Sequence, residues 1–371
     1  MRVTIVGGGI LGTSHAYEAV RRGHQVRQLE REPEARGATV RNFGLVWVSG
    51  RTVAELDAAL RSRELWERIG TDIPGVGFRP AGSLTLLRSP AEVAVAEEVL
   101  ARPDARRRGF TLLDADQVRR LNPALQGKFV AALHCSTDAA VESRVALPAI
   151  RQYLAASGRY TFEPSTEARS INGTTVHDDR GGVHEADLVL VFAGAAHGGL
   201  VREIAGDLPV RRVRLQMMQT APWDQQLTTA IADGDSFRYY PGFAGAALDE
   251  LQRNESQSEI AHDERMQLLC VQRLGGGLTI GDTHEYAEPF SFDVGEDPYA
   301  YLVNVVEEFL GQKLPPVQKR WAGVYSQCVD PAELACRVNV GAGVWVITGP
   351  GGRGMTLGPV LAEQTADLAG L

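Results

Sequence analysis

A glycine-rich motif close to the N-terminus has the spacing of a turn that binds a dinucleotide. Gly7, Gly9 and Gly12 occur in the order G-x-G-x-x-G, and Glu30 follows eighteen residues after the last glycine. Glycines at this spacing permit a tight turn, let the backbone approach a pyrophosphate and allow a helix to pack closely on a strand. A carboxylate in the place of Glu30 accepts hydrogen bonds from the ribose hydroxyls and repels a 2′-phosphate. The motif therefore predicts a cofactor that contains ADP, either FAD or NAD, and disfavours NADP.

Such a motif works only between a strand and a helix, and the flanking residues favour that arrangement. Residues 3–6 form a β-branched run typical of a buried strand, and a helix is predicted from the glycines to about Arg22. A second strand over residues 25–29 ends at Glu30. Two later segments, residues 187–195 and 344–354, again combine a buried strand with a glycine turn, and the second leads into a helix. The first helix would present free N–H groups and a partial positive charge to the phosphates.

Length and composition limit the classes of protein that this chain can belong to. Its 371 residues predict two domains, and 44% hydrophobic with 23% charged residues is typical of a soluble globular chain. The net charge of −8 disfavours a nucleic-acid partner. The four cysteines form no CxxC pair, so no metal site is expected and a reducing cytoplasm fits the chain. No apolar run is long enough for a signal peptide or a membrane span, so no membrane partner is expected.

Four landmarks in chain order carry a resemblance to a known family. They are the N-terminal motif with Glu30, the loop at residues 36–44, the strand and turn at residues 187–195 and the loop at residues 349–356. Together they are similar to the FAD-dependent amine and amino-acid oxidases of the D-amino-acid oxidase, glycine oxidase and sarcosine oxidase superfamily. The resemblance implies an α/β fold in which a Rossmann-like FAD-binding domain accompanies a discontinuous substrate domain on a mostly antiparallel sheet. The expected FAD-binding domain comprises residues 1–81, 136–210 and 320–371, and the expected substrate domain comprises residues 82–135 and 211–319.

The same resemblance selects FAD over NAD and assigns residues to it. In the family, the C-terminal loop and helix direct their amides at the flavin, where reduction leaves negative charge that a helix N-terminus stabilises. Non-covalent FAD is expected, because residues 321–325 lack the cysteine that links flavin in sarcosine oxidase and Cys328 comes a few residues late. The expected FAD-binding residues are Gly7, Gly9, Ile10, Leu11, Gly12, Glu30, Arg31, Arg36, Thr39, Arg41, Asn42, Ala193, Gly194, Gly351, Gly352, Arg353, Gly354, Met355 and Thr356.

Five short phrases are similar to a narrower subgroup, the oxidoreductases associated with aminophosphonate breakdown. They lie at residues 138–144, 216–220, 281–286, 321–325 and 354–357. This resemblance implies an amine oxidase that acts on 2-aminoethylphosphonate or its N-methyl derivative. Hydride would pass from the carbon α to nitrogen to flavin N5, the imine would hydrolyse to phosphonoacetaldehyde, and O₂ would reoxidise the flavin with release of H₂O₂.

Departures from the family put an amino-acid substrate in doubt. Thr356 stands where monomeric sarcosine oxidase has a lysine that binds the substrate carboxylate. Residues 324–328 contain no arginine of the kind that glycine oxidase has there. Both usual carboxylate anchors are absent, which leaves room for a different anion.

Several side chains could bind or deprotonate such a substrate. Arg238 with Tyr239 and Tyr240 suits a phosphonate, although an edge strand with a solvated arginine explains them equally. His284 could take the proton of the substrate ammonium, or it could be a structural loop histidine. Arg353 could bind the substrate anion or place positive charge near the reduced flavin, or it could form a surface salt bridge.

Alternating strands at residues 83–87, 213–220 and 278–282 predict the sheet that would roof the flavin. Gln216 and Met218 could face the pocket from one of them, although either face of a core strand has the same pattern. Residues 106–108, three consecutive arginines, are expected to form a solvated linker, and residues 249–264 an exposed helix or an exposed excursion of the chain.

Two alternatives stay open for the activity. One is an oxidase or dehydrogenase of the sarcosine or glycine type, which in the second case passes electrons to a carrier instead of O₂. The other is a non-catalytic flavin-binding protein that assists assembly of a partner, an interpretation that the missing carboxylate anchors keep open.

Overall fold

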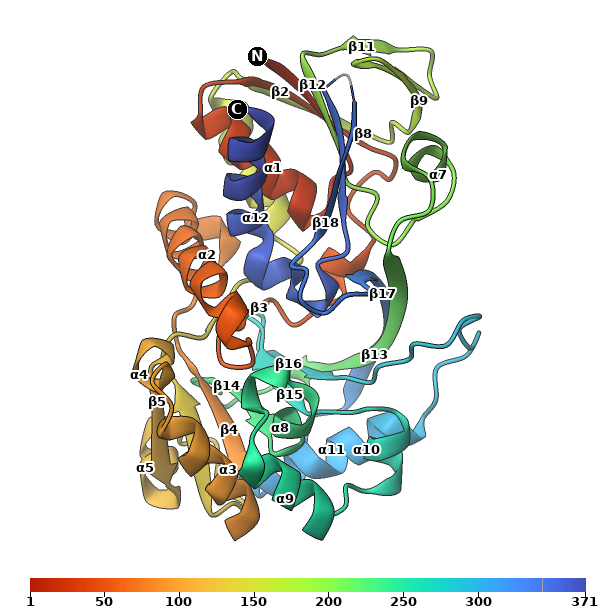
Figure 1. Cartoon of the computed structure of the whole chain (residues 1–371). Coiled ribbons are helices and arrows are strands. Elements are labelled where there is room, and N and C mark those ends of the chain that lie inside the picture. Colours follow the sequence, from red (N-terminus) through yellow and green to blue (C-terminus); the bar gives the residue numbers. More distant parts are fainter. Residues whose placement is uncertain (342) are drawn as a thin grey trace.

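The glycine-rich motif joins the first strand and the first helix of a mainly parallel sheet in the computed structural model, which describes residues 1–341 and 343–371 (Figure 1). β1 pairs in parallel with β2 on one side and with β12 on the other, and only the edge strand β18 runs antiparallel to its neighbour among the described strands of this sheet. In spatial order the strands are β18 (Cys336–Gly341), β19 (Val344–Thr348), β12 (Leu188–Val191), β1 (Arg2–Val6), β2 (Gln25–Glu30) and β8 (Tyr160–Pro164).

Both faces of this sheet are covered, which explains the apolar strands. Val3 and Ile5 point into a core formed with four helices, α1 (Ile10–Arg21), α2 (Val53–Asp72), α6 (Ala146–Ala156) and α12 (Gly354–Ala369). Val189 and Val191 point to the opposite face, which a three-stranded meander and α7 (Leu200–Ala205) cover. The meander consists of β9 (Ala168–Asn172), β10 (Thr175–Asp178) and β11 (Val183–Glu185). A strand buried on both faces carries apolar residues without alternation, as parallel sheets do.

A second sheet forms the other half of the molecule. Among the described strands, β14 and β4 pair in parallel and the other neighbours are antiparallel. The fold class expected from the resemblance is therefore confirmed. In spatial order the strands are β17 (Val317–Cys328), β13 (Val210–Pro222), β16 (Gly277–Gly281), β15 (Leu269–Gln272), β14 (Ala230–Asp233), β4 (Ser83–Leu87), β6 (Ala131–Cys135) and β5 (Phe110–Asp114).

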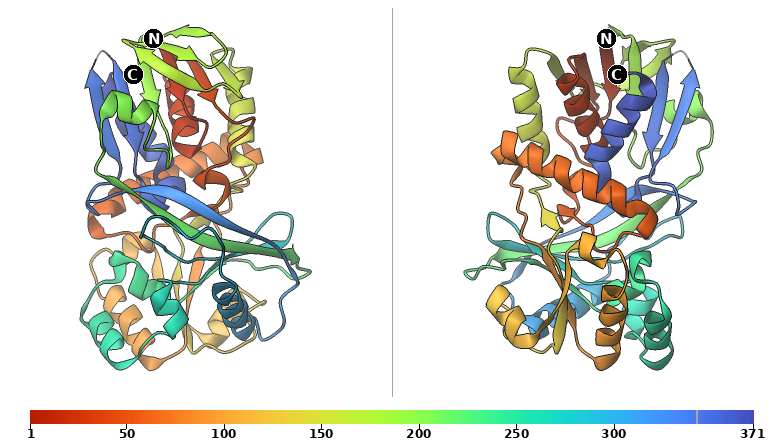
Figure 2. Two further views of the ribbon diagram at one scale, coloured as in Figure 1. Left: turned by 90° about the vertical axis from the view of Figure 1, so that its right-hand side faces the viewer. Right: turned by 60° about the vertical axis from the view of Figure 1, so that its left-hand side comes forward.

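The two halves are connected by β13 and β17, which cross the middle of the molecule side by side (Figure 2). These strands extend past the expected domain boundaries at residues 210 and 320. A short pair, β3 (Leu45–Val46) with β7 (Ala139–Ala140), lies near the same junction. Short 3-10 turns complete the connections: η1 (Ala38–Val40), η2 (Pro74–Val76), η3 (Pro241–Phe243) and η4 (Gly351–Arg353).

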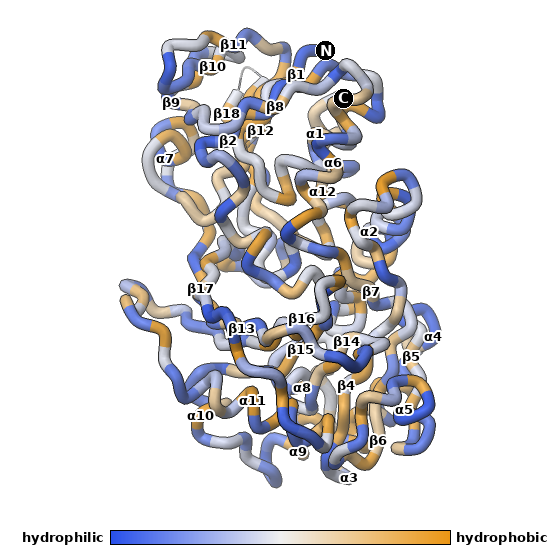
Figure 3. Tube along the Cα trace, turned by 180° about the vertical axis from the view of Figure 1, so that it is seen from behind, coloured by the Kyte–Doolittle hydropathy of each residue, from blue (hydrophilic) through white to orange (hydrophobic). Residues whose placement is uncertain are grey.

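Alternation along the second sheet separates a core face from a cavity face. Met218 and Ile280 point into a core beneath the sheet, whereas Leu215 and Met217 point toward the first half of the molecule. Hydrophobic residues concentrate along inner strands such as β4 and β6, and hydrophilic residues colour the outer turns (Figure 3). The covering helices are α3 (Pro90–Leu100), α4 (Ala105–Arg108), α5 (Ala115–Leu121), α8 (Asp235–Tyr239), α9 (Ala246–Asn254), α10 (Glu259–Asp263) and α11 (Asp297–Leu310).

Residues 106–108, interpreted as a solvated linker, are exposed as expected at Arg106 and Arg107, but the interpretation is wrong for Arg108. They belong to helix α4, and Arg108 is only 2% exposed. Its Nη1 donates to the carbonyl oxygens of Ser49 and Arg51 at 3.2 and 2.7 Å, and its Nε donates to Asp104 at 2.6 Å. Arg108 thus fixes the segment that leads into α2.

The exposed helix expected at residues 249–264 is two helices, α9 and α10, and each buries an apolar side chain, Leu251 and Ala261. Among the described helices, none is both long and apolar enough to cross a bilayer.

Candidate active site

A cavity of about 1480 Å³ is lined by residues from both sheets. Its volume exceeds the ~300–1,000 Å³ of ordinary small-ligand pockets, so an extended ligand is required to fill it. At one end it reaches Glu30 at the carboxyl end of β2, and at the other it reaches Tyr239 and His284. The end at Glu30 is the nucleotide end, and the end at Tyr239 and His284 is the substrate end.

Backbone geometry dominates the nucleotide end. Gly7 has φ +110°, and a Cβ there would lie 2.2 Å from the carbonyl oxygen of Phe192. A Cβ on Gly12 would lie 2.1 Å from the carbonyl oxygen of Gly7, so only glycine lets α1 pack this close to the turn. α1 begins at Ile10 with its N-terminus at the cavity. These features make a cradle for a pyrophosphate, and they fit the ADP part of FAD.

Glu30 is held at the rim of this cradle. Its Oε2 accepts a hydrogen bond from the Gly8 amide at 2.6 Å, and its Oε1 accepts one from the Glu32 amide at 3.0 Å. The carboxylate therefore stands at the end of β2, where the sequence placed the ribose-binding acid. Arg31 and Arg36 line the same rim with exposed side chains.

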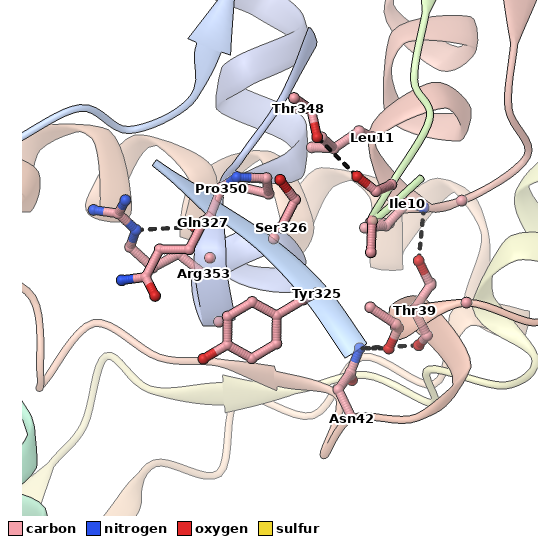
Figure 4. A pocket seen from close by; sticks show the side chains of 18 of the residues that line it. Ile10, Leu11, Thr39, Asn42, Tyr325, Ser326, Gln327, Thr348, Pro350 and Arg353 are labelled. Carbon is pink, nitrogen blue, oxygen red and sulfur yellow. Dashed lines mark hydrogen bonds between the residues drawn. The ribbon is translucent and has the colours of Figure 1, made fainter. Parts of the chain in front are cut away.

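The loop at residues 36–44 closes one wall of the cavity (Figure 4). Thr39 Oγ1 accepts a hydrogen bond from the Ile10 amide at 3.0 Å. Asn42 Nδ2 donates to the Thr39 carbonyl at 2.9 Å, and Arg41 Nη1 donates to the Ala322 carbonyl at 2.8 Å. These side chains line the cavity and also hold the loop against α1 and β17.

A second wall comes from β17 and the C-terminal loop, where Tyr325, Ser326, Gln327 and Pro350 lie together (Figure 4). Gly351 has φ +64°, and α12 begins at Gly354 with its N-terminus at the cavity. Every expected FAD-binding residue lines the cavity, including Leu11, Ala193, Gly194, Gly352 and Met355.

Arg353 lines the cavity, but its charge is already paired. Its guanidinium forms a salt bridge with Glu55 and donates to the carbonyl oxygens of Pro350 and Glu333 at 3.0 and 2.8 Å. Burial would raise the pKa of Glu55, but nearby Arg51, the backbone at Thr52 and Arg353 outweigh it and hold that pKa below its usual value. Arg353 therefore offers no free positive charge to a substrate.

Thr356 also lines the cavity without a free hydroxyl. Its Oγ1 accepts from the Trp47 amide at 2.9 Å and donates to the Leu45 carbonyl at 3.4 Å. The side chain ties the start of α12 to the segment after β3, so its position is structural.

Three expected substrate residues lie outside the cavity lining, and Arg238 is the first of them. Arg238 Nη2 donates to the Glu255 carbonyl at 2.7 Å, and its Nε lies 3.3 Å from Asp235. Residues 235–239 form helix α8, not an edge strand, which directs Arg238 away from Tyr239 and Tyr240 on the cavity wall. The expectation that Arg238 anchors the substrate is corrected accordingly.

On β13, the residues that line the cavity differ by one position from those expected. Met218 is fully buried in the core beneath the sheet, and Gln216 is buried and likewise absent from the cavity lining. Leu215 and Met217 line the cavity instead. Because side chains alternate along a strand, an error of one residue exchanges the two faces.

Arg51 is a cavity residue that the sequence interpretation missed. It is 6% exposed, its Nε donates to the Trp47 carbonyl at 3.1 Å, and its guanidinium carbon lies 5.6 Å from the centroid of the Tyr240 ring. Within the described chain, neither Nη1 nor Nη2 has a hydrogen-bond partner. Burial lowers the pKa of Arg51, but a guanidinium stays charged in proteins. No motif marks this arginine, since it stands between a glycine and the cap of α2.

His284 and Asp282 stand side by side at the substrate end. His284 Nδ1 donates to the Arg265 carbonyl at 3.0 Å, and its ring stacks on Tyr239 with centroids 4.1 Å apart. Burial lowers the pKa of His284 to about 4, so the imidazole is neutral at pH 7 and Nε2 carries the lone pair.

Asp282 was not among the expected site residues. It is 5% exposed, its Oδ2 lies 3.8 Å from His284 Nε2, and burial raises its pKa to about 8. The residue directly follows β16, a position that has no motif of its own.

The family model described as FAD dependent oxidoreductase matches residues 2–368 of this chain. The chain belongs to this family. FAD is therefore its cofactor, in agreement with the cradle at the nucleotide end. The family is one of oxidoreductases, which places the chain among flavoenzymes as the resemblance implied.

Individual relatives agree with the family but are distant. An opine oxidase component of Rhizobium meliloti is 28% identical over 191 residues, which are 46% of this chain and 52% of that protein. This chain thus spans about half the length of that relative. Glycine oxidase from Bacillus cereus superposes with a TM-score of 0.78 at 19% identity, covering 100% of this chain and 94% of that one. Iminodiacetate oxidase from Chelativorans gives 0.77 at 20% identity, with coverage of 100% and 95%. At these identities the structures show a shared fold.

Proposed function

We propose that this flavoprotein oxidises the C–N bond of a small anionic amine, and that 2-aminoethylphosphonate or its N-methyl derivative is the substrate, with phosphonoacetaldehyde as the product. The observation that carries the proposal is the buried guanidinium of Arg51, whose Nη1 and Nη2 lack partners within the described chain at the substrate end of the cavity. A planar guanidinium binds a phosphonate or carboxylate through paired hydrogen bonds. Arg51 thereby takes the role that the sequence interpretation assigned to Arg238.

FAD supplies the acceptor for the hydride that leaves the carbon next to nitrogen. The chain binds and orients both reactants. Gly7, Gly12 and Glu30 hold the ADP part, and the N-terminus of α12 faces the cavity where negative charge develops. Arg51 fixes the anionic group of the substrate, so the amine is directed to a constant place.

Aromatic side chains form much of the wall at the substrate end. Tyr239, Tyr240 and Tyr325 line it together with His284. Phenols are neutral at pH 7, burial raises the pKa of each of these three still further, and their rings form a largely apolar surface. An apolar wall lowers the local dielectric and so strengthens the ion pair between Arg51 and the substrate anion.

We further propose that FAD is bound without a covalent link and that O₂ is the acceptor. Cys328, the cysteine nearest to the position that links flavin in sarcosine oxidase, is 4% exposed and is not among the cavity-lining residues. The other three cysteines are buried and likewise absent from the described lining.

A carboxylate-bearing secondary amine is the second candidate substrate. It is favoured by the similarity to iminodiacetate oxidase, whose name specifies such an amine. Arg51 would bind a carboxylate by the same paired hydrogen bonds.

The test mixes the purified FAD-loaded protein with each amine in the absence of O₂. Reduction of the flavin is monitored as a loss of its absorbance. The panel contains 2-aminoethylphosphonate, its N-methyl form, glycine, sarcosine, iminodiacetate and D-alanine. Reduction by the aminophosphonates alone supports the proposal. Reduction by carboxylates alone replaces it with the second candidate, and bound flavin that no amine reduces makes the protein a non-catalytic flavoprotein.

A further inference from the structure

Asp282 is a buried carboxyl group without a cationic partner in the described chain, and it lies at the substrate end of the cavity. It is 5% exposed, and its Oδ1 has no hydrogen-bond partner among the described residues. The backbone around it is fixed, because the Asp282 amide donates to the Gln267 carbonyl at 3.0 Å. A buried carboxyl oxygen without a partner costs free energy, and the position of Asp282 in the cavity lining leaves Oδ1 available to a group that enters the cavity.

The groups that face Asp282 are neutral at pH 7. His284 lies on the same segment, and Gln267 precedes β15. Tyr239 ends α8, Tyr240 directly follows it, and Tyr325 lies on β17. Arg265 touches the far side of His284 through its carbonyl oxygen, and Arg51 lies across the Tyr240 ring. Among the described residues, no arginine or lysine forms a salt bridge with Asp282, so the ammonium of a bound substrate would supply the missing positive charge.

His284 is poorly suited to take a proton from an ammonium group. Its Nδ1 proton is committed to the Arg265 carbonyl, and its pKa of about 4 makes Nε2 a weak base. A proton acceptor works best when its pKa lies near the working pH. Burial raises the pKa of Asp282 to about 8, which meets that condition.

We propose that Asp282 is the group that accepts the proton of the substrate ammonium. This inference rests on the proposed function. The approaching ammonium favours the carboxylate form, so Asp282 first releases its resting proton to solvent. An N–H bond of the ammonium then breaks and an O–H bond forms on the carboxylate, while the electron pair stays on nitrogen. The neutral amine so formed can lose hydride from its carbon, and one proton has been released per substrate bound.

The first test is the pH dependence of anaerobic flavin reduction in the wild type and in Asp282→Asn. Removing a general base typically slows a reaction by ~10²–10⁴-fold, so we expect about a 100-fold slower reduction at pH 7 and loss of the rise with pH. Asp233→Asn is the matched control, because Asp233 is also a fully buried carboxyl but lies outside the cavity lining. His284→Asn must keep the rise with pH, and its disappearance in that variant alone would assign the proton to His284 and overturn the proposal.

The second test does not depend on turnover. 2-Amino-2-methylpropylphosphonate has no hydrogen on the carbon next to nitrogen, so it binds without being oxidised. Calorimetry of its binding in buffers of different ionisation enthalpy counts the protons released. We expect about one proton for the wild type at pH 7 and none for Asp282→Asn. Equal release by both proteins would refute the role of Asp282, whereas failure of every amine to reduce the wild-type flavin would refute the proposed function itself.

Discussion

The two ends of the cavity are built in different ways. At the nucleotide end, the contacts come from one short stretch of the chain, since Gly7 and Gly12 shape one turn and Glu30 ends the next strand. At the substrate end, Arg51 precedes α2 and Asp282 follows β16, more than 200 residues later in the chain. The first end depends on backbone geometry and the second on converging side chains. A site made of local backbone can be recognised in a sequence, and a site made of distant side chains becomes visible only after folding.

The largest expected effect breaks the nucleotide end. In Gly12→Ala the new Cβ would lie 2.1 Å from the Gly7 carbonyl oxygen, which forces α1 away from β1. We expect FAD to be lost on gel filtration and the free energy of unfolding to fall by about 3 kcal/mol, the upper range for overpacking. Flavin absorbance and denaturant unfolding measure the two effects. Gly275→Ala is the control, because nothing lies within 4 Å of its Cβ position, and equal FAD retention in both variants would contradict the cradle.

The next prediction sharpens the substrate end by comparing two arginines. Arg51→Met should lower kcat/KM for an anionic amine by about 100-fold, because a charge-assisted pair contributes ~1.5–3 kcal/mol, and should change a neutral amine little. Arg238→Met also removes one positive charge, but outside the cavity lining, so it should leave the ratio of kcat/KM for the anionic amine to kcat/KM for the neutral amine unchanged. Steady-state kinetics with both amines measures the ratio. A larger change in Arg238→Met than in Arg51→Met would restore the anchor suggested by the sequence.

The smallest expected effect concerns stability at low pH. His15, on α1, is 2% exposed, and burial lowers its pKa to about 3. The unfolded chain binds a proton below about pH 6.5 and the folded chain does not, so stability falls as pH drops, by about 1.4 kcal/mol per pH unit. Asp282 acts in the opposite sense, because its raised pKa removes stability as pH rises toward 8.

Urea unfolding of the wild type and of His15→Gln at pH 7 and pH 5 isolates the histidine. The wild type should lose about 2 kcal/mol more than the variant over this interval. Parallel losses in the two proteins would show that His15 is protonated in the folded state.

The correction on β13 shows why part of the site could not be predicted. Gln216 and Met218 alternate with Leu215 and Met217 along one strand, and both sets are compatible with a buried sheet. Which set faces the cavity depends on the side from which α11 packs, and this packing is a long-range property.

The two arginine misassignments have a related cause. Arg238 stands next to two tyrosines that do reach the cavity, but the turn of α8 directs it to Asp235. Arg108 stands in a basic run, yet it is buried because it caps the carbonyl oxygens of the segment before α2. Neighbours in sequence share a face only when the local backbone places them there.

The sequence by itself determined a cofactor that contains ADP and the turn that binds it, because those depend on glycines and strand patterns within about thirty residues. The choice of FAD and the α/β fold with its antiparallel substrate sheet were implied by the family resemblance of four landmarks spread along the whole chain. Tertiary structure alone decided which charges face the substrate. Glu55 neutralises Arg353, Arg108 secures the backbone at Arg51, and Asp282 is left without a cationic partner in the described chain. The reason is physical: the strength of a charge in a cavity depends on its burial and on its partners, and these are contributed by segments distant in the chain.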